Sequence, residues 1–475
     1  MTESWVNVAE RIGSDLHLEL AGTGGRRAVL AEALREAVRS GRLAPGTRLP
    51  PYRSLAADLG LARNTVADAY AELVAEGWLV GRQGSGTRVA PRTDPVKPLR
   101  RKEKRPGGVP GPVHLLRSGQ PDAASFPRSA WVTAARRALT AVPNEAFGPG
   151  DPRGRPDLRA ALADYLSRAR GVRTDADRVV ICSGFGHALQ LLFGAGVLRG
   201  PVSFDSYGLW VHRELLERAG ARTVPQAVDD DGVVTSELVR HKGIRVAMVT
   251  AAHQFPLGGA LHSDRRVELV EWARARGGVI LEDDYDGEFR YDRQPVGALQ
   301  GLDPDRVIYA GSVSKSLSPA VRVGWLVLPE HLVDDVAAAK GERESWTSVP
   351  DQLTLAELIT SGAYDRHLRR MRQRYRQRRD QLVHTLAERV PHIEVTGIAA
   401  GLHAVLRLPS GTERTALLAA RWQGIALEGL STFRHPRAVM PTQDGLVVGY
   451  AAPTDSAYAS ALEALCRVLE GVSPG

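Results

Sequence analysis

Lys315 is the residue of this sequence best placed for covalent chemistry. It is one of only six lysines among 475 residues, and it follows an apolar run at residues 307–310 that is typical of a buried strand. A partly desolvated lysine loses its proton more readily, and its neutral amine attacks carbonyl carbons to form a Schiff base. The position of Lys315 therefore predicts a covalent bond to an aldehyde cofactor.

Residues near two strand ends have the chemistry that a phosphate group needs. Gly186 begins a helical pattern soon after the apolar run 179–182, and free backbone N–H groups at such a turn bind anions. A glycine turn without a ligand is about as common, so this loop alone is a weak signal. Hydroxyl and guanidinium groups near Lys315 could complete a phosphate-binding site. We expect cofactor contacts from Gly186, His187, Ser312, Ser314 and Arg322.

Asp283 and Tyr285 follow another apolar run, at residues 279–281, and should point to the same face of their strand. A carboxylate such as Asp283 keeps a pyridine nitrogen protonated, and Tyr285 can bond a ring hydroxyl. Tyr207 follows the run 202–204 and can stack on a planar ring, although a tyrosine packed in the core is commoner. A single cofactor would use all of these groups: the lysine, the phosphate-binding residues, the carboxylate and the phenol. That cofactor is pyridoxal 5′-phosphate (PLP).

Two simpler interpretations apply to the same residues. A salt-bridged lysine beside a capped helix would account for one of these motifs, but not for five of them in strand order. The acidic cluster at residues 282–286 could bind a metal ion, but the nearby histidines lack metal-ligand spacing. No metal site is predicted.

The elements that position these residues read as an α/β fold. Short apolar runs alternate with helical patterns, which indicates a mainly parallel sheet with both faces covered by helices. In such sheets ligands bind beyond the carboxyl ends of the strands, where the residues above stand. The predicted strands include residues 179–182, 202–204, 246–250, 279–281 and 307–310.

The first 90 residues have a different layout. Three helical patterns are followed by two short apolar segments around the turn GRQGSG. Three helices and a hairpin make a winged helix-turn-helix, which places the start of its third helix in the major groove of DNA. The expected helices span residues 26–40, 54–59 and 62–76, and the expected strands span residues 77–80 and 87–89.

The predicted DNA contacts follow from that layout. Arg63, Asn64 and Thr65 start the recognition helix, and their side chains suit guanine, adenine and phosphate or thymine respectively. Arg53, at the start of the second helix, should face the DNA backbone. The tip of the wing offers further contacts from Gly84 and Ser85.

The charge of the chain is concentrated near its start. The net charge is +8; residues 1–112 hold 18 basic and 12 acidic residues. Most of this excess falls in the Pro/Gly-rich segment 91–112, which holds seven basic and two acidic residues and reads as an extended linker. We therefore expect a winged helix over residues 16–90, a linker over 91–112 and an effector domain over 113–475. Placement of specific residues, more than net charge, supports DNA binding.

The remaining composition suggests the cellular compartment. Cys182 and Cys466 are the only cysteines, too few to cross-link a chain of this length, which favours a reducing cytoplasm. No apolar run approaches the length of a membrane span, and the polar first residues do not resemble a signal peptide. A cytoplasmic protein without membrane contact is expected.

Two families resemble parts of this chain. The stretch PGTRLPPYRSLAADLGLARNTVADAYAELVAEGWLVGRQGSGTRV is similar to the DNA-binding domain of GntR-type regulators. HQFPLGG, EDDYDGEF and SVSKSLSPAVRVGW resemble the fold-type I, PLP-dependent aminotransferases over about residues 113–470. Together they resemble the MocR subfamily of GntR-type transcription regulators. The resemblance implies the same cofactor roles for Lys315, Asp283, Tyr285, Tyr207, Ser312 and Arg322. It also implies a homodimer, with each DNA-binding domain resting on the partner's large domain.

The sequence departs from the aminotransferase pattern where substrates bind. Val447 stands where the enzymes carry an arginine for the substrate carboxylate, and Phe255 stands in place of the asparagine that bonds the cofactor hydroxyl. Phe147 replaces a common tyrosine. In the DNA-binding part, Tyr52 and Ala62 occupy positions where the family commonly has serine. Cofactor capture is predicted to be intact, and substrate capture impaired.

These observations favour a transcription regulator over two alternatives. PLP, or its imine with an amino compound, would be the effector that changes binding to double-stranded promoter DNA, with vitamin B6 or amino-compound metabolism as the controlled process. The rival interpretation is a working aminotransferase that carries a DNA-binding domain. The sequence does not decide between the two, but it favours a regulator without enzymatic activity. A DNA-binding architectural protein with an inactive large domain conflicts with the Lys315, Asp283 and Tyr285 set.

Overall fold

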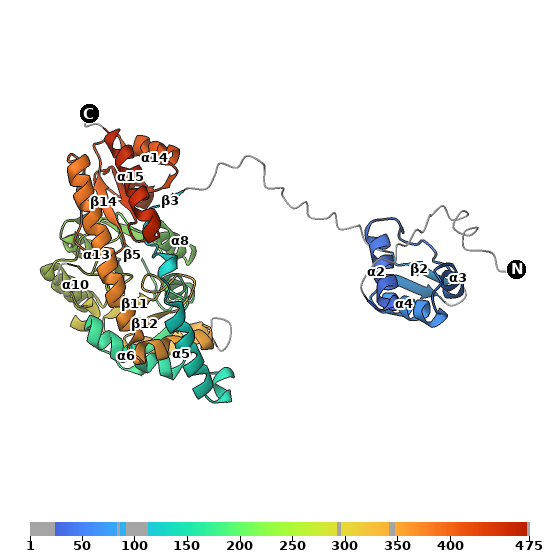
Figure 1. The fold of residues 1–475 in the computed structure, drawn as a ribbon. Helices are drawn as coiled ribbons and strands as arrows, with labels where there is room; N and C mark the ends of the chain where they lie inside the picture. Colours follow the sequence, from blue (N-terminus) through green and yellow to red (C-terminus); the bar gives the residue numbers. More distant parts are fainter. Residues whose placement is uncertain (1–23, 83–85, 92–112, 292–295, 342–346, 473–475) are drawn as a thin grey trace. The chain divides into compact units, whose positions relative to one another are not determined.

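The computed structural model describes residues 24–82, 86–91, 113–291, 296–341 and 347–472 (Figure 1). The chain divides into two compact units, residues 1–109 and residues 110–475. Each unit has its own hydrophobic core and is described here by itself. In the described part of the chain, no helix is both long and apolar enough to cross a membrane.

The first unit is a winged helix. Its helices are α2 (Arg26–Arg39), α3 (Tyr52–Asp58) and α4 (Arg63–Ala75), and its antiparallel hairpin is formed by β1 (Leu79–Arg82) and β2 (Gly86–Val89). Leucine, valine and alanine side chains from all three helices and both strands form one core. Arg35 of α2 forms ion pairs with Glu72 (2.8 Å) and Glu76 (2.7 Å) of α4. The predicted arrangement of three helices and a hairpin is confirmed.

The start of α4 lacks a side-chain cap. Ala62 is the N-cap residue, and no side chain there accepts a hydrogen bond from the free N–H groups of the first turn. We expect Ala62→Ser to supply that bond and to stabilise the unit by about 1 kcal/mol. Thermal unfolding of the variant should show a rise of a few degrees in the melting temperature of this unit. A fall would mean that the hydroxyl cannot reach the N–H groups.

The second unit is built on a seven-stranded sheet with the order β4-β12-β11-β10-β9-β5-β6. Its strands are β4 (Val179–Cys182), β5 (Val202–Asp205), β6 (Thr223–Gln226), β9 (Val246–Val249), β10 (Val279–Asp283), β11 (Val307–Ser312) and β12 (Gly324–Val327). Only β12 runs antiparallel to its neighbours. Five of these strands coincide with the five predicted runs, although β9 ends one residue before the predicted end at position 250, so the mainly parallel α/β sheet is confirmed.

Helices bury both faces of this sheet. Alternate residues along a strand point to opposite faces, so Ile181 belongs to one core and its neighbour Val180 to another. The first core includes α6 (Pro156–Arg170), α12 (Val349–Thr360) and α13 (Ala363–Arg389); the second includes α7 (Phe185–Leu189), the π-helix that continues it (Gln190–Gly194) and α11 (Glu330–Lys340). Helix α10 (Ser263–Arg276) covers β9 and β10. Helix α8 (Trp210–Arg218) follows β5, and α9 (Thr235–Arg240) precedes β9. Helix α5 (Arg128–Ala141) packs on α12.

A smaller sheet follows near the end of the chain, with the order β13-β14-β17-β16. Its strands are β13 (Glu394–Thr396), β14 (Ala404–Arg407), β16 (Glu428–Gly429) and β17 (Gly445–Val448), and it is flanked by α14 (Glu413–Trp422) and α15 (Asp455–Glu470). The pairing of β16 with β17 sets Glu428 opposite Val447. Close by, β3 (His114–Leu115) pairs with β15 (Ile425–Ala426), so the first described residues after position 112 join this region.

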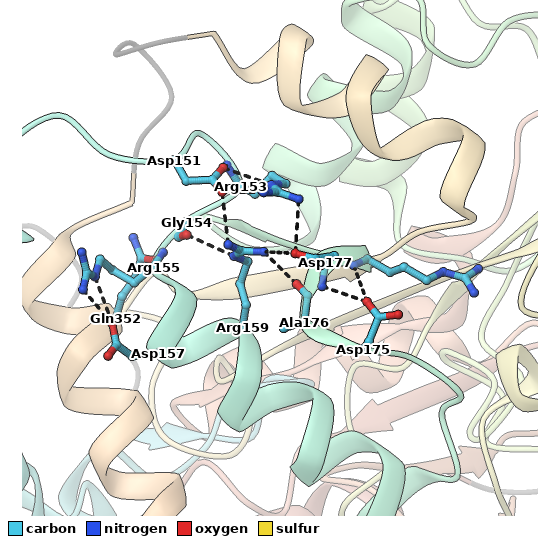
Figure 2. A network of polar contacts seen from close by, with 11 residues as sticks. Asp151, Arg153, Gly154, Arg155, Asp157, Arg159, Asp175, Ala176, Asp177 and Gln352 are labelled. Atoms are coloured by element: carbon cyan, nitrogen blue, oxygen red, sulfur yellow. Dashed lines mark hydrogen bonds and ion pairs between the residues drawn. The ribbon is translucent and has the colours of Figure 1, made fainter.

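A charged network fixes the loop before α6 against β4 (Figure 2). Arg159, which is 5% exposed, donates to the Ala176 carbonyl (2.9 Å) and pairs with Asp151 (3.1 Å). The neighbouring Gly154 has φ = 104°, and a Cβ there would lie 2.5 Å from the Ile181 side chain. Only glycine fits this approach, so the loop sequence is dictated by its contact with β4, the strand that leads into the site.

Candidate functional site

The carboxyl ends of the sheet strands surround one cavity of about 340 Å³, a volume that suits a small organic cofactor. Strands β4, β5, β9, β10 and β11 all contribute, directly or through the loop that follows them. The residues that line it are Ser118, Gly119, Gly184, Phe185, Gly186, Phe204, Asp205, Gly208, Leu209, His212, Met248, Val249, Thr250, Phe255, Asp283, Tyr285, Ser312, Ser314, Lys315, Pro319, Arg322, Glu428 and Phe433.

Lys315 enters the cavity three residues after the end of β11. Its Nζ donates to the Gly119 carbonyl. Burial lowers the pKa of the Lys315 ammonium, and the nearby carboxylates of Asp286 and Asp283 oppose that shift. Desolvation brings the amine closer to its neutral, nucleophilic form, as the sequence predicted for a lysine at a strand end.

Asp283 is the last residue of β10, and its carboxylate faces the cavity. Burial, followed by the charge of Asp284, raises the pKa of Asp283 to about 8. Oδ2 of Asp283 lies 3.9 Å from Nδ1 of His212, and burial together with the Lys315 charge lowers the pKa of His212 to about 3. A neutral imidazole cannot pair with the carboxylate. Among the described residues, Asp283 therefore has no lysine or arginine within ion-pair distance, although the Lys315 charge acts on it from farther away, and a protonated ring nitrogen would supply a direct partner.

Tyr285 lies on the same side as Asp283, as the strand alternation predicted. Its hydroxyl is 3.0 Å from His253 Nδ1, and the same nitrogen is 2.9 Å from Asp286 Oδ2. His253 and Asp286 are 3% and 2% exposed. This buried pair fixes the phenol that points into the cavity.

A second group of polar residues suits a phosphate. The Gly184–Gly186 loop lines the cavity, and the Arg322 guanidinium lies about 3.5 Å from where a Cβ on Gly184 would be. Ser312 and Ser314 line the same cavity. Arg322 has φ = 56°, a left-handed value that residues other than glycine rarely adopt. Such a conformation costs free energy and is found most often where a side chain must be aimed at a ligand.

In the winged helix, the residues predicted to contact DNA lie at the surface. Arg53, Arg63 and Asn64 are exposed, and Thr65 is half-buried. The guanidinium of Arg63 lies 5.3 Å from the centre of the Tyr52 ring, a cation–π distance that joins the starts of α3 and α4. The tyrosine that departs from the family pattern thus supports Arg63. Gly84 and Ser85, predicted at the wing tip, lie outside the described residues.

Comparison with known proteins covers both units. Residues 112–465 match the family "Aminotransferase class I and II", and residues 27–89 match "Bacterial regulatory proteins, gntR family". The probable rhizopine catabolism regulatory protein MocR of Rhizobium meliloti is 33% identical over 445 residues, which cover 89% of each chain. The chain belongs to the MocR subfamily of GntR-type transcription regulators. Family membership makes it a DNA-binding regulator with an aminotransferase-like domain, whose cofactor is PLP.

Other MocR-type and aminotransferase relatives agree with this assignment. The HTH-type pyridoxine biosynthesis transcriptional regulator PdxR of Corynebacterium glutamicum is 34% identical over 378 residues, covering 79% of this chain and 82% of PdxR. Kynurenine aminotransferase of Pyrococcus horikoshii superposes with a TM-score of 0.68 at 23% identity, covering 75% and 90% of the two chains. That structural likeness shows that the large unit of this MocR-type chain has the aminotransferase fold.

Two predicted cofactor contacts of the MocR-type domain are not at the cavity. His187 is not among the lining residues; its Nδ1 accepts a hydrogen bond from the Ser183 N–H (3.0 Å), so the ring caps its own loop. Tyr207 is fully buried in an apolar cluster with Val405 and with Phe433, which itself lines the cavity. Its hydroxyl accepts from the Gln443 N–H (3.0 Å). Neither His187 nor Tyr207 is among the residues that line the cavity, so the phosphate contact of His187 and the ring stacking of Tyr207 stay predictions.

The acidic residues around Asp283 do not converge. Glu282 accepts hydrogen bonds from the N–H groups of Leu299 (2.8 Å) and Gln300 (3.0 Å), and Asp284 forms a buried ion pair with Arg170 (2.7 Å). Only Asp283 of these three lines the cavity. Elsewhere, ligand-type atoms of His253, Asp286 and His403 lie within 4.8 Å of one another. The hydrogen bonds of His253 already account for its contact with Asp286, and the expectation of no metal stays a prediction.

Sequence reasoning missed several lining residues. Phe185 and His212 place their rings 4.7 Å apart at the cavity wall, where Phe204, Phe255 and Phe433 add further aromatic surface. Glu428 reaches the cavity from β16 and accepts hydrogen bonds from the N–H and hydroxyl of Ser118 (3.3 and 2.9 Å). The paired rings, Glu428 and Ser118 come from helices α7 and α8, the second sheet and the segment before α5, and no local pattern marked them as cofactor contacts.

Of the three positions at which this MocR-type chain departs from the aminotransferase pattern, Phe147 is exposed, and Val447 and Phe255 lie among apolar side chains. Val447 is fully buried in the cluster that contains Tyr207. Phe255 lines the cavity and packs edge-on against Tyr285 and Phe433. An aromatic ring thus replaces a hydrogen-bonding amide beside the tyrosine.

Proposed function

We propose that occupancy of the cavity, by PLP alone or together with an amino compound, controls how tightly the winged helix binds promoter DNA. The observation that carries this proposal is the convergence of Lys315, Asp283 and Tyr285 on one cavity of cofactor size. A ligand can act as an effector only if it prefers one of two states of the protein. The cavity supplies the binding energy for that preference.

The proposed roles follow the chemistry of each lining group. Arg322, Ser312 and Ser314, with the backbone N–H groups of the Gly184–Gly186 loop, would hold the phosphate. Asp283 would hold the ring nitrogen protonated, and Tyr285, fixed by His253, would bond the ring hydroxyl. PLP supplies an electrophilic carbon that reacts with primary amines. Lys315 is the residue proposed to bind that carbon.

The proposal includes an arrangement of the chain. Residues 16–90 would form the DNA-binding domain, residues 91–112 the linker and residues 113–475 the effector domain. Helix-turn-helix proteins commonly bind two half-sites as dimers, which supports a homodimer, domain-swapped as in the family, as the DNA-binding form. Light scattering of the full-length protein during size-exclusion chromatography should give a mass of about twice 51.3 kDa.

Relatives suggest what the regulator controls. PdxR is named for pyridoxine biosynthesis, and MocR for rhizopine catabolism. We propose that this chain acts on vitamin B6 or amino-compound metabolism, from promoters beside its own gene.

DNA binding with and without PLP tests the function. Fluorescence anisotropy of labelled DNA from the region upstream of its own gene should show salt-sensitive binding whose dissociation constant changes when PLP is added. No change would contradict control by PLP, and no binding would contradict the regulator. Transfer of amino groups between an amino acid and a 2-oxo acid, at rates typical of enzymes (about 1–1000 per second), would instead support the aminotransferase alternative.

The raised pKa of Asp283 predicts how pH affects the PLP-free protein. An aspartate with an ordinary pKa near 4 in the unfolded chain and about 8 in the folded chain contributes stability below pH 4. That stability is lost as the pH rises from 4 to 8, because ionisation is easier after unfolding. Between pH 6 and pH 9, the melting temperature should therefore fall further in the wild type than in Asp283→Asn, which cannot ionise. Other buried carboxyls affect both proteins equally, so superimposable pH profiles would contradict this assignment.

A further inference from the structure

The polar contacts of the cavity fall into two groups. One group contains the residues proposed to bind the phosphate, with Arg322 beside Gly184. The other surrounds the Lys315 amine, whose Nζ donates to the Gly119 carbonyl. Ser118, the preceding residue, donates from its N–H and its hydroxyl to Oε2 of Glu428. Two consecutive residues therefore connect the reactive amine to a carboxylate, and Glu428 lies at the Lys315 end of the cavity.

Glu428 has a free hydrogen-bonding position. Both bonds from Ser118 go to Oε2, and the described residues provide Oε1 with no hydrogen bond or ion pair. Glu428 is half-buried and lines the cavity. The residue opposite it in the sheet, Val447, is fully buried among apolar side chains and offers no charge. A half-buried carboxylate with one unused oxygen is a binding position for a cation.

The described lining offers little to a negatively charged ligand at this end. Its positive side chains are Lys315 and Arg322, because His212 has a pKa of about 3. Lys315 is used by the cofactor in the proposed function, and Arg322 by the phosphate. A ligand carboxylate near Lys315 would meet the like charge of Glu428 with no remaining cation to balance it, and like charges in a partly dry cavity repel strongly.

We propose that the cavity admits, beside the cofactor, a primary amine that carries a second cationic group and no carboxylate, and that Glu428 selects it. Oε1 of Glu428 binds the second cation, while the first amine faces the cofactor carbon near Lys315. Amino acids are rejected by the same carboxylate. This inference rests on the proposed function, since it requires PLP in the cavity, and it names the chemical class of the amino compound.

Three small molecules of similar length test the selection. The PLP-loaded, full-length protein is titrated by calorimetry with 1,4-diaminobutane, butylamine and 4-aminobutyrate, and the visible absorbance of the cofactor is followed in parallel. We expect 1,4-diaminobutane to bind about tenfold more tightly than butylamine, the effect of one charge-assisted hydrogen bond. 4-Aminobutyrate should bind more weakly than butylamine.

Glu428→Gln separates charge from shape. The amide keeps an oxygen for Ser118 but loses the charge, so the advantage of 1,4-diaminobutane over butylamine should fall from about tenfold to about twofold or less, and 4-aminobutyrate should gain. All three ligands are measured in each variant. A general loss of folding would lower every affinity alike, whereas a loss of selection would change the ratio of the affinities for 1,4-diaminobutane and butylamine. Glu271→Gln on the exposed side of α10 removes a matched charge away from the cavity and should leave the ratios unchanged.

The two levels of the proposal fail differently. A wild-type protein with no visible absorbance of bound PLP contradicts the proposed function, and this inference with it. A protein that binds PLP but takes 4-aminobutyrate as tightly as 1,4-diaminobutane contradicts the inference alone. The same holds if Glu428→Gln keeps the tenfold ratio.

Discussion

Lys315→Ala is expected to abolish the visible absorbance of protein-bound PLP and, with it, the effect of PLP on DNA binding. The variant keeps Asp283 and the residues proposed to bind the phosphate, so weak non-covalent binding of PLP can persist. It removes the only amine whose pKa is lowered by burial at this cavity among the described residues. Absorbance spectra after dialysis, and anisotropy titrations of promoter DNA with and without PLP, measure the two effects.

Lys242→Ala is the matched control, because Lys242 is exposed and lies outside the cavity lining. It should keep both the absorbance and the PLP response of the wild type. Retention of the visible band by Lys315→Ala after dialysis would show that another amine binds the cofactor.

Arg63→Ala is expected to weaken binding to the promoter by roughly tenfold or more, corresponding to the 1–3 kcal/mol of an arginine that reads a base edge. Arg63 is exposed at the first turn of α4 and its guanidinium is held near the Tyr52 ring. Its removal should not unfold the domain, because it belongs to no buried cluster. Anisotropy at two salt concentrations, on promoter and on unrelated DNA, measures the loss of affinity and of specificity.

Two comparisons make this result specific. Arg173→Ala removes an exposed positive charge from the large unit and should leave DNA affinity unchanged. Tyr52→Leu keeps Arg63 but removes its aromatic support, and a smaller loss of affinity is expected. Equal affinities of Arg63→Ala and the wild type would place the recognition surface elsewhere.

Local patterns were sufficient for most elements of the fold. Five apolar runs became strands of one sheet, in which only β12 separates β4 from the other four. Asp283, Tyr285, Ser312, Ser314 and Lys315 all reached the cavity, because the carboxyl ends of parallel strands meet at one edge. Strand β12 was not predicted, and its antiparallel direction depends on a turn rather than on periodicity.

The placements that sequence patterns did not predict have a common physical origin. His187 lies in the short helix α7 and Tyr207 in the segment after β5, and the direction of both side chains depends on the backbone turn after a strand and not on a repeating pattern. Glu428 and Ser118 are 310 residues apart in the sequence and meet only through tertiary structure. Such contacts cannot be found from spacing along the chain.

The pairing of β3 with β15 gives the chain between the two units a fixed anchorage. Residues 113–119 follow directly after position 112, form that pairing, and end at Gly119, whose carbonyl accepts the hydrogen bond from Lys315. The stretch from position 113 to the carbonyl that accepts the bond from Lys315 is therefore only seven residues long. Any ligand that draws Lys315 away from Gly119 therefore releases a hydrogen bond on the short stretch that follows position 112.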